Sequence, residues 1–113
     1  MSETTTETIR IRELNDAHRT GLQPSGKILI TQGVQAEGSA FIQAAGAAVR
    51  AFSDFTPDND PHGTHDFGAV DLFNRHLFWK IDYYDQSLQW GSPDPADPDV
   101  TCRVLTIMLA EEY

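Results

Sequence analysis

The sequence predicts an α+β domain in which an antiparallel β-meander packs against helices, in the order α-β-α-β-β-β-α. Two observations predict this fold class. Apolar residues recur at helical spacing in three segments, and short runs rich in β-branched and aromatic residues lie between them. The chain has 113 residues, which suffices for one hydrophobic core. We therefore expect a disordered start over residues 1–6 and a single domain over residues 7–113.

The first predicted element is a helix over residues 5–20. Thr4 and Glu7 have the spacing of a capping box, and Gly21 supplies a stop. The apolar stripe of this helix is thin, so we expect it to dock at the edge of the core; the stripe consists of Ile11, Leu14 and His18.

A strand and a second helix complete the first half of the chain. A turn over residues 23–26 leads into a β-prone run over residues 27–31, which we expect to form a buried strand. Gly38 and Ser39 then open the clearest helix, which extends to Phe52. Its remaining apolar residues recur with a helical period at Phe41, Ile42, Ala45, Ala48 and Val49.

Three strands are predicted next, over residues 67–73, 76–84 and 87–90. A two-residue turn at Asn74-Arg75 would place Val70 opposite Trp79. Alternation along the strands then assigns their residues to two faces. The apolar face, which we expect to be the core, holds Val70, Leu72, Leu77, Trp79, Ile81 and Tyr83, and the mixed face holds Phe67, Ala69, Asp71, Phe73, His76, Phe78, Lys80, Asp82 and Tyr84.

The last predicted element is a helix from Pro98 to about Ala110. Asp97 can cap this helix, Pro98 suits its first position, and a broad apolar stripe follows. The single cysteine, Cys102, would be buried in this helix, as expected in a reducing compartment. Glu111 and Glu112 would then lie at the negative end of the helix dipole, which is an unfavourable place for an acid. An acidic surface that contacts a partner would be one reason for their presence there.

The net charge of −9 arises in the second half of the chain. Residues 1–53 contain five acids and five bases, whereas residues 54–113 contain twelve acids and three bases. Such a surface repels phosphate backbones, so we expect no direct binding of nucleic acid and favour a basic protein surface or a cation. The alternative is that the negative charge simply keeps the protein soluble.

The start of the chain and its hydropathy predict a cytoplasmic protein without membrane contact. No apolar run approaches the ~20 residues of a membrane span. The first residues also lack the basic and apolar regions of a secretory signal.

Residues 58–66 contain three carboxylates and two imidazoles between prolines and glycines. These groups could hold zinc, manganese or iron in a mixed nitrogen and oxygen site that activates water for hydrolysis. An EF-hand is excluded because Ala69 stands where a calcium loop needs a bidentate Glu. The alternative is a tight loop whose Asp side chains form turns. The candidate metal ligands are Asp58, Asp60, His62, His65 and Asp66.

The mixed face of the predicted sheet is the candidate binding surface. Four aromatic side chains share it with charged ones, and aromatic anchors with a charged rim are typical of a protein interface. Two alternatives are that the first helix covers this face and that a homodimer forms through it. The candidate partner-binding residues are Phe67, Asp71, Phe73, Phe78, Lys80, Asp82, Tyr84, Glu111 and Glu112.

From about Ile28 to its end, the chain resembles a bacterial family known as domain of unknown function 3768. The resemblance is carried by residues 58–68 (DNDPHGTHDFG), 78–85 (FWKIDYYD) and 91–98 (GSPDPADP), the last running into residues 103–113 (RVLTIMLAEEY). It implies no activity and no site residues. It implies a setting among accessory genes of plasmids and other mobile elements, where inhibitors of host restriction or CRISPR defence are common and acidic DNA mimicry is one of their devices.

These observations favour a non-enzymatic acidic binding protein that inhibits a nucleic-acid-handling defence enzyme of the host. No nucleophile elbow or phosphate-binding glycine loop is present, so we predict no catalytic residue and no cofactor. Two alternatives from other classes are a metal-dependent hydrolase that uses residues 58–66 and a structural subunit of a larger assembly.

Overall fold

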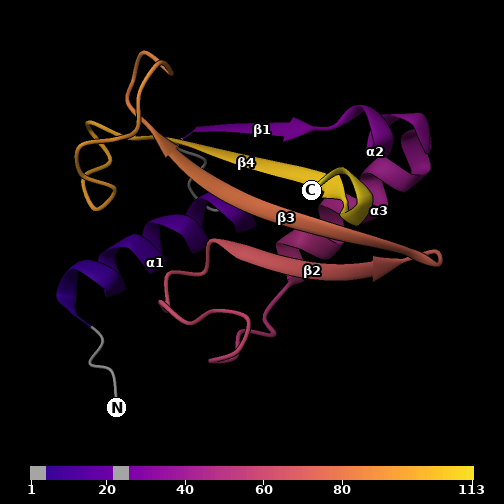
Figure 1. The fold of residues 1–113 in the computed structure, drawn as a ribbon, viewed down its shortest axis with the longest axis horizontal. Helices are drawn as coiled ribbons and strands as arrows, with labels where there is room; N and C mark the ends of the chain where they lie inside the picture. Colours follow the sequence, from indigo (N-terminus) through magenta and orange to yellow (C-terminus); the bar gives the residue numbers. More distant parts are fainter. Residues whose placement is uncertain (1–4, 22–25) are drawn as a thin grey trace.

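The computed structural model describes residues 5–21 and 26–113, in which helices pack on one face of a four-stranded mixed sheet (Figure 1). The strand order is β1-β4-β3-β2; β2 and β4 are antiparallel to β3, and β1 is parallel to β4. This architecture confirms the predicted α+β class. The strands are β1 (Gly26–Ile30), β2 (Phe67–Leu72), β3 (Arg75–Tyr84) and β4 (Cys102–Leu109), and the helices are α1 (Thr6–Thr20), α2 (Gln32–Ala36), α3 (Ser39–Ala51) and the short 3-10 helix η1 (Ala110–Glu112).

The predicted helix over residues 5–20 is confirmed as α1. Thr5 is its N-cap, and the Thr5 hydroxyl accepts a hydrogen bond from the amide of Thr8 at 3.0 Å. Gly21 ends the helix in the left-handed conformation (φ 80°) that glycine adopts without strain. Thr4, with most of the predicted disordered start, and the turn at residues 23–25 lie outside the described residues.

Helix α3 is also confirmed, and it buries the predicted side chains of Phe41, Ala45 and Val49. The five-residue α2 was not predicted. Its segment has no helical period to detect, because the helix is shorter than two turns.

The predicted C-terminal helix is wrong, because this segment forms β4 at the centre of the sheet. A central strand whose side chains are buried on both faces is apolar at nearly every position, so its sequence imitates a broad helical stripe. Only Thr106 in β4 is not buried. Cys102 is therefore buried as predicted, but in a strand.

The predicted strand over residues 87–90 is also wrong. This segment is the exposed tip of the loop between β3 and β4, and only Gly91 forms an isolated bridge, to Tyr84. The third strand of the antiparallel meander is β4 instead.

The predicted turn between β2 and β3 is displaced by one residue. Its two central residues are Phe73 and Asn74, both with positive φ (49° and 63°), as a type I′ turn requires. Asp71 therefore pairs with His76, and Val70 pairs with Leu77 instead of Trp79. The shift moves each pairing by two positions, so the predicted faces are retained.

Strand β1 lies at the edge of the sheet, so the prediction of a buried strand is wrong. Ile28 and Leu29 are about half exposed, at 54% and 50%. An edge strand has a neighbour on one side only, here β4.

The hydrophobic core lies between the helices and the predicted apolar face of the sheet. It contains the side chains of Val34, Phe41, Ala45, Val49, Leu77, Trp79, Ile81, Leu105, Ile107 and Leu109, with Val70, Leu72 and Tyr83 at its margin.

The opposite side of the sheet, which we call the open face, is not covered by an α-helix of the described chain (Figure 1). Helix α1 lies on the core side, where Asn15 contacts Tyr83 and Arg103. The alternative that α1 covers the mixed face is therefore wrong. The open face consists of Lys27, Leu29, Phe67, Ala69, Asp71, His76, Phe78, Lys80, Asp82, Tyr84, Val104, Thr106 and Met108.

Candidate functional site

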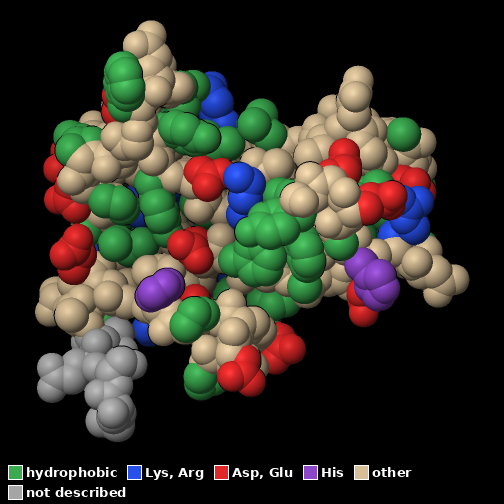
Figure 2. All heavy atoms as spheres, viewed as in Figure 1, with side chains coloured by type: hydrophobic (Ala, Val, Ile, Leu, Met, Phe, Trp, Pro, Cys, Tyr) green, Lys and Arg blue, Asp and Glu red, His purple; other side chains and the backbone are tan. Residues whose placement is uncertain are grey.

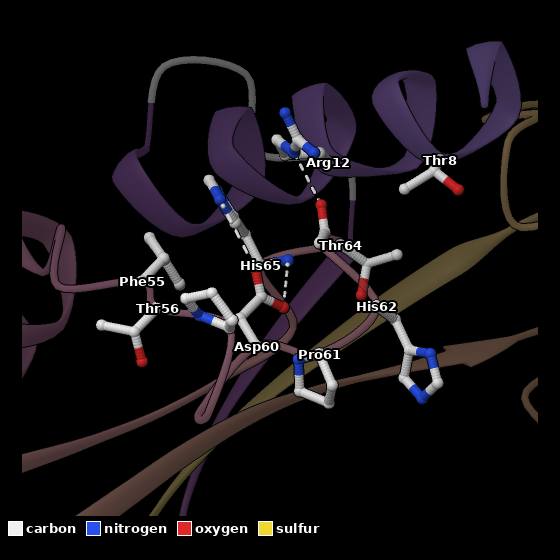
Figure 3. A pocket seen from close by; sticks show the side chains of 11 residues that line it. Thr8, Arg12, Phe55, Thr56, Asp60, Pro61, His62, Thr64 and His65 are labelled. Carbon is white, nitrogen blue, oxygen red and sulfur yellow. Dashed lines mark hydrogen bonds and ion pairs between the residues drawn. The ribbon is translucent and has the colours of Figure 1, made fainter. Parts of the chain in front are cut away.

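The loop over residues 58–66 is held against α1 by two hydrogen bonds to its backbone. Arg12 Nε donates to the carbonyl oxygen of Gly63 at 2.6 Å, and Asn15 Nδ2 donates to that of Thr64 at 2.9 Å. Between this loop and α1 lies a polar pocket of about 560 Å³ (Figure 3). Helix α1, which lies far away in sequence, thus forms one wall of the pocket.

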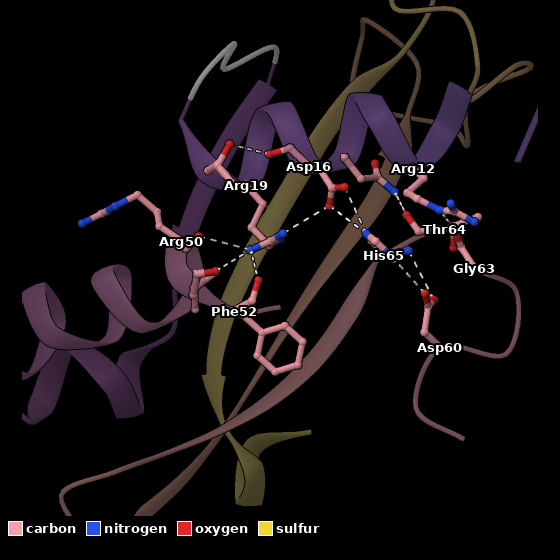
Figure 4. A network of polar contacts seen from close by, with 12 residues as sticks. Arg12, Asp16, Arg19, Arg50, Phe52, Asp60, Gly63, Thr64 and His65 are labelled. Carbon is pink, nitrogen blue, oxygen red and sulfur yellow. Dashed lines mark hydrogen bonds and ion pairs between the residues drawn. The ribbon is translucent and has the colours of Figure 1, made fainter. Parts of the chain in front are cut away.

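His65 is the central residue of this loop (Figure 4). Its Nδ1 lies 3.0 Å from Oδ1 of Asp16 on α1, and its Nε2 lies 3.6 Å from Oδ2 of Asp60. The ring stacks on Phe55 with a centroid distance of 3.7 Å and an interplanar angle of 4°. Both ring nitrogens therefore face carboxylate groups, one on α1 and one in the loop itself.

The five predicted metal ligands do not converge. Asp60 and His65 contact each other, whereas Asp66 accepts a hydrogen bond from the hydroxyl of Tyr83 at 3.1 Å. Asp58 and His62 are exposed. Over residues 5–21 and 26–113, no group of three or more His, Cys, Asp or Glu side chains is placed to hold a metal ion.

Sequence reasoning did not identify the residues of α1 that fix this loop. Arg12, Asp16 and Arg19 follow one another at helical spacings of four and three, so they share a face of the helix. This polar stripe is the sequence feature that could have indicated a contact between α1 and another part of the chain. A polar stripe on a helix usually faces solvent, so it does not by itself show what contacts it.

Two buried arginines on the core side of the sheet have structural partners. Arg19 is 4% exposed and donates to the carbonyl oxygens of Val49 and Phe52 at 2.8 and 2.9 Å, near the C-terminal end of α3. Arg103 is fully buried, donates to Asn15 Oδ1 at 2.7 Å and packs against the ring of Tyr83. Burial lowers the pKa of Arg103, and burial raises the pKa of Tyr83 to about 12. Tyr83 is thus a neutral hydrogen-bond donor at physiological pH.

The open face contains the better candidate site. Phe67, Phe78 and the C-terminal Tyr113 form an aromatic cluster with centroid distances of 5.2, 5.4 and 5.8 Å. Figure 2, which views this face, shows hydrophobic side chains gathered over the middle of the sheet beside charged ones. Tyr113 is 75% exposed and Phe67 and Phe78 are half-buried, so solvent reaches the aromatic cluster mainly at Tyr113.

Charged groups on the open face form close pairs. Lys80 Nζ lies 2.7 Å from Asp82 Oδ2, and this hydrogen bond raises the pKa of Lys80. The carboxylate of Asp71 contacts His76 Nδ1. Next to the Lys80–Asp82 pair lies a hollow of about 430 Å³, lined by Lys27, Leu29, Lys80, Asp82, Tyr84, Leu88, Val104 and Thr106.

Three of the predicted partner-binding residues lie off this face. Phe73 lies in the β2–β3 turn, and the centroid of its ring lies 6.1 Å from that of Phe41 on α3. Glu111 Oε1 contacts Arg75 Nη2 at 2.8 Å. Glu112 accepts hydrogen bonds from the hydroxyl of Thr31 and the amide of Gly33, at 2.6 and 3.0 Å.

Most of the acidic excess lies at one end of the sheet. Strands β2 and β4 begin and β3 ends there, so the loops over residues 52–66 and 85–101 both lie at this end (Figure 1). These loops contain eight of the twelve acids in the second half of the chain: Asp54, Asp58, Asp60, Asp66, Asp85, Asp94, Asp97 and Asp99.

The comparison with known families agrees with the resemblance found in the sequence. A family model described as "Protein of unknown function (DUF3768)" matches residues 30–112. No curated protein and no solved structure matches the chain. Across the part of the chain that the structure describes, no helix has both the length and the apolar content that a membrane crossing requires.

Proposed function

We propose that this chain, which belongs to the DUF3768 family, is a non-enzymatic binding protein that engages a basic protein partner through its open face. One observation carries the proposal. Helices α2 and α3 pack on the core side of the sheet, and α1 lies on that side through Asn15. The aromatic cluster lies on the side that no α-helix of the described chain covers.

The chemistry of the open face is that of a protein interface. Clustered aromatic side chains bury large areas at small entropic cost and are enriched among residues that dominate binding energy. Phe78, at the centre of the cluster, contacts both Phe67 and Tyr113. The pair Lys80–Asp82 lies beside it and supplies polar groups of the kind found at interface rims.

The charge distribution supports a basic partner. The loop over residues 85–101 contains four carboxylates and no Lys or Arg, and it borders the open face through Leu88. Such a field attracts a cationic surface and accelerates its association in a salt-dependent way. The partner class we propose is a cytoplasmic nucleic-acid-handling enzyme of host defence, since such enzymes present basic surfaces for phosphate backbones and the family resemblance implies mobile elements.

Affinity capture from bacterial lysate at low and high salt tests this function, with identification of the captured protein by mass spectrometry. We expect a basic, nucleic-acid-binding protein that is retained at low salt, released at high salt and displaced by double-stranded DNA.

Two matched variants locate the surface that is used. The double variant Asp71→Asn/Asp82→Asn neutralises two carboxylates on the open face. The control Asp54→Asn/Asp58→Asn neutralises two carboxylates in the loop over residues 52–66. We expect the first pair to slow association several-fold and the second to have little effect. Equal effects of the two pairs, or no partner at low salt, would contradict the proposal.

A further inference from the structure

The loop between β3 and β4 begins with a rigid tip over residues 85–91. Asp85 N donates to the carbonyl oxygen of Trp90 at 2.8 Å, and Leu88 N donates to that of Asp85 at 3.0 Å. The carboxylate of Asp85 accepts further bonds from the hydroxyl of Ser87 and the amide of Gln89, at 2.7 and 3.3 Å. The tip is therefore ordered by its own hydrogen bonds.

This rigid tip displays two large apolar side chains to solvent. Trp90 is 72% exposed, whereas the other tryptophan, Trp79, is fully buried. Leu88 is 40% exposed and has a left-handed backbone (φ 62°), which is unfavourable for a leucine. A strained backbone that holds apolar side chains outward is typical of a binding segment. Such a segment loses little conformational entropy when a partner docks.

The tip lies beside the open face and belongs to the acidic loop over residues 85–101. Leu88 lines the hollow on the open face together with Tyr84 and Val104. Four carboxylates and no Lys or Arg lie in the same loop as Trp90, over residues 85–101. An exposed indole in a loop that contains only acidic charges attracts Arg and Lys side chains, the ring through cation–π interactions and the carboxylates through ionic ones.

We propose that Leu88 and Trp90 are the anchor residues of this protein's interface, and that Trp90 enters an apolar pocket of a folded protein partner whose rim presents Arg and Lys side chains. This inference rests on the proposed function and specifies its contact point. The acidity of the loop disfavours the alternative occupant of an exposed tryptophan, an anionic membrane surface.

Photo-crosslinking of the full chain in bacterial lysate locates the contact. The crosslinker p-benzoylphenylalanine replaces Trp90 in one protein and Phe73 in another. Phe73 is the matched control because it is 70% exposed but lies at the opposite end of β3. We expect one basic protein, identified by mass spectrometry, to be crosslinked from position 90 and not from position 73.

Binding measurements with that purified protein then test the two side chains. We expect Trp90→Ala to raise the Kd by about tenfold or more, Trp90→Phe to raise it less, and Phe73→Ala to leave it within about twofold. Leu88→Gly relieves the left-handed strain, so it should weaken binding without lowering the thermal midpoint. That combination separates a contact residue from a structural one.

The outcomes distinguish this inference from the function on which it rests. If Trp90→Ala binds as tightly as the wild type while Asp71→Asn/Asp82→Asn binds more weakly, the anchor is wrong and the open face remains the interface. If wild-type protein captures no basic partner, both are wrong. Binding of Trp90-containing protein to vesicles of anionic phospholipid, lost in Trp90→Ala, would also overturn the inference.

Discussion

The carboxylate of Glu112, in η1, is held by three hydrogen bonds. It accepts them from the hydroxyl of Thr31 and from the amides of Gly33 and Leu109. Gly33 has no side chain, and a Cβ there would lie 2.6 Å from this carboxylate. Glu112 therefore joins η1 to the start of α2.

We predict that Glu112→Gln changes the acid dependence of stability. The hydrogen bond from Thr31, followed by that from Leu109, lowers the pKa of Glu112 below its usual value of 4.5. A lowered pKa contributes stability above the usual value, and this contribution is lost as the pH falls through the folded-state pKa. The stability difference between wild type and variant should therefore be largest at neutral pH and shrink below about pH 4.5.

Urea unfolding at a series of pH values checks this prediction. The control is Glu111→Gln, since Glu111 only forms an exposed ion pair with Arg75. A difference between wild type and Glu112→Gln that stays constant down to pH 3, or that Glu111→Gln reproduces, would show that the lowered pKa is not responsible.

Gly68 is a second residue whose role lies in packing. It is buried in β2 opposite Trp79, and a Cβ there would lie 2.4 Å from Nε1 of the indole. Because Trp79 is fully buried and cannot move outward, we predict that Gly68→Ala costs about 1–3 kcal/mol of unfolding free energy. Gly91→Ala is the control, because its Cβ would meet only Tyr83 O at 4.0 Å. Equal stability of the two variants in urea unfolding would refute this packing account.

Among the elements, α1 is attached to the sheet mainly through the polar side chain of Asn15 and less through apolar side chains. Asn15 is fully buried and connects α1 to the 58–66 loop, to β3 and to β4, through Thr64, Tyr83 and Arg103. The apolar stripe is thin, as the sequence predicted, and only Leu14 of its apolar members is buried.

We predict that Asn15→Ala lowers the unfolding free energy by about 3 kcal/mol, because it removes a partner of the buried guanidinium of Arg103. Arg103→Met in the same background should recover part of this loss, since the buried charge is then gone. Asn59→Ala, at an exposed position, should cost less than about 1 kcal/mol. Additive effects of Asn15→Ala and Arg103→Met in denaturant unfolding would contradict the coupling.

The long elements with one solvated face could be predicted from the sequence, and the strand without one could not. Helices α1 and α3 and the faces of β2 and β3 follow from periodic burial, and these predictions are confirmed. Strand β4 is buried on both faces, so it has no period of two. The register of the β2–β3 hairpin depends on which two residues adopt positive φ in the turn. Phe73 is one of them, and because phenylalanine rarely adopts positive φ, the sequence did not indicate this register.

The candidate sites show the same limit. The mixed face was predicted from alternation, and all of its residues except Phe73 lie together on the open face. The contacts of His65 could not be predicted, because Asp16 lies 49 residues away in the sequence and only the fold brings the two together. Leu88 and Trp90 were assigned to a strand, which concealed their exposure at a loop tip.

At the scale of the whole molecule, the sheet separates two kinds of surface. On the core side, buried polar groups such as Arg19, Asn15 and Arg103 are used to fix helices and loops. On the open side, aromatic and apolar groups remain accessible, and the acidic loop with Trp90 borders them. This asymmetry is the physical basis of the proposed function.

Hydrogen–deuterium exchange of the full chain, alone and with the captured basic partner, tests this asymmetry most directly. We expect the partner to slow amide exchange in the tip over residues 85–91 and in the strands beneath the open face, and to leave α1 and residues 54–66 unchanged. Slowed exchange confined to α1 and residues 54–66, with the tip unaffected, would contradict this expectation.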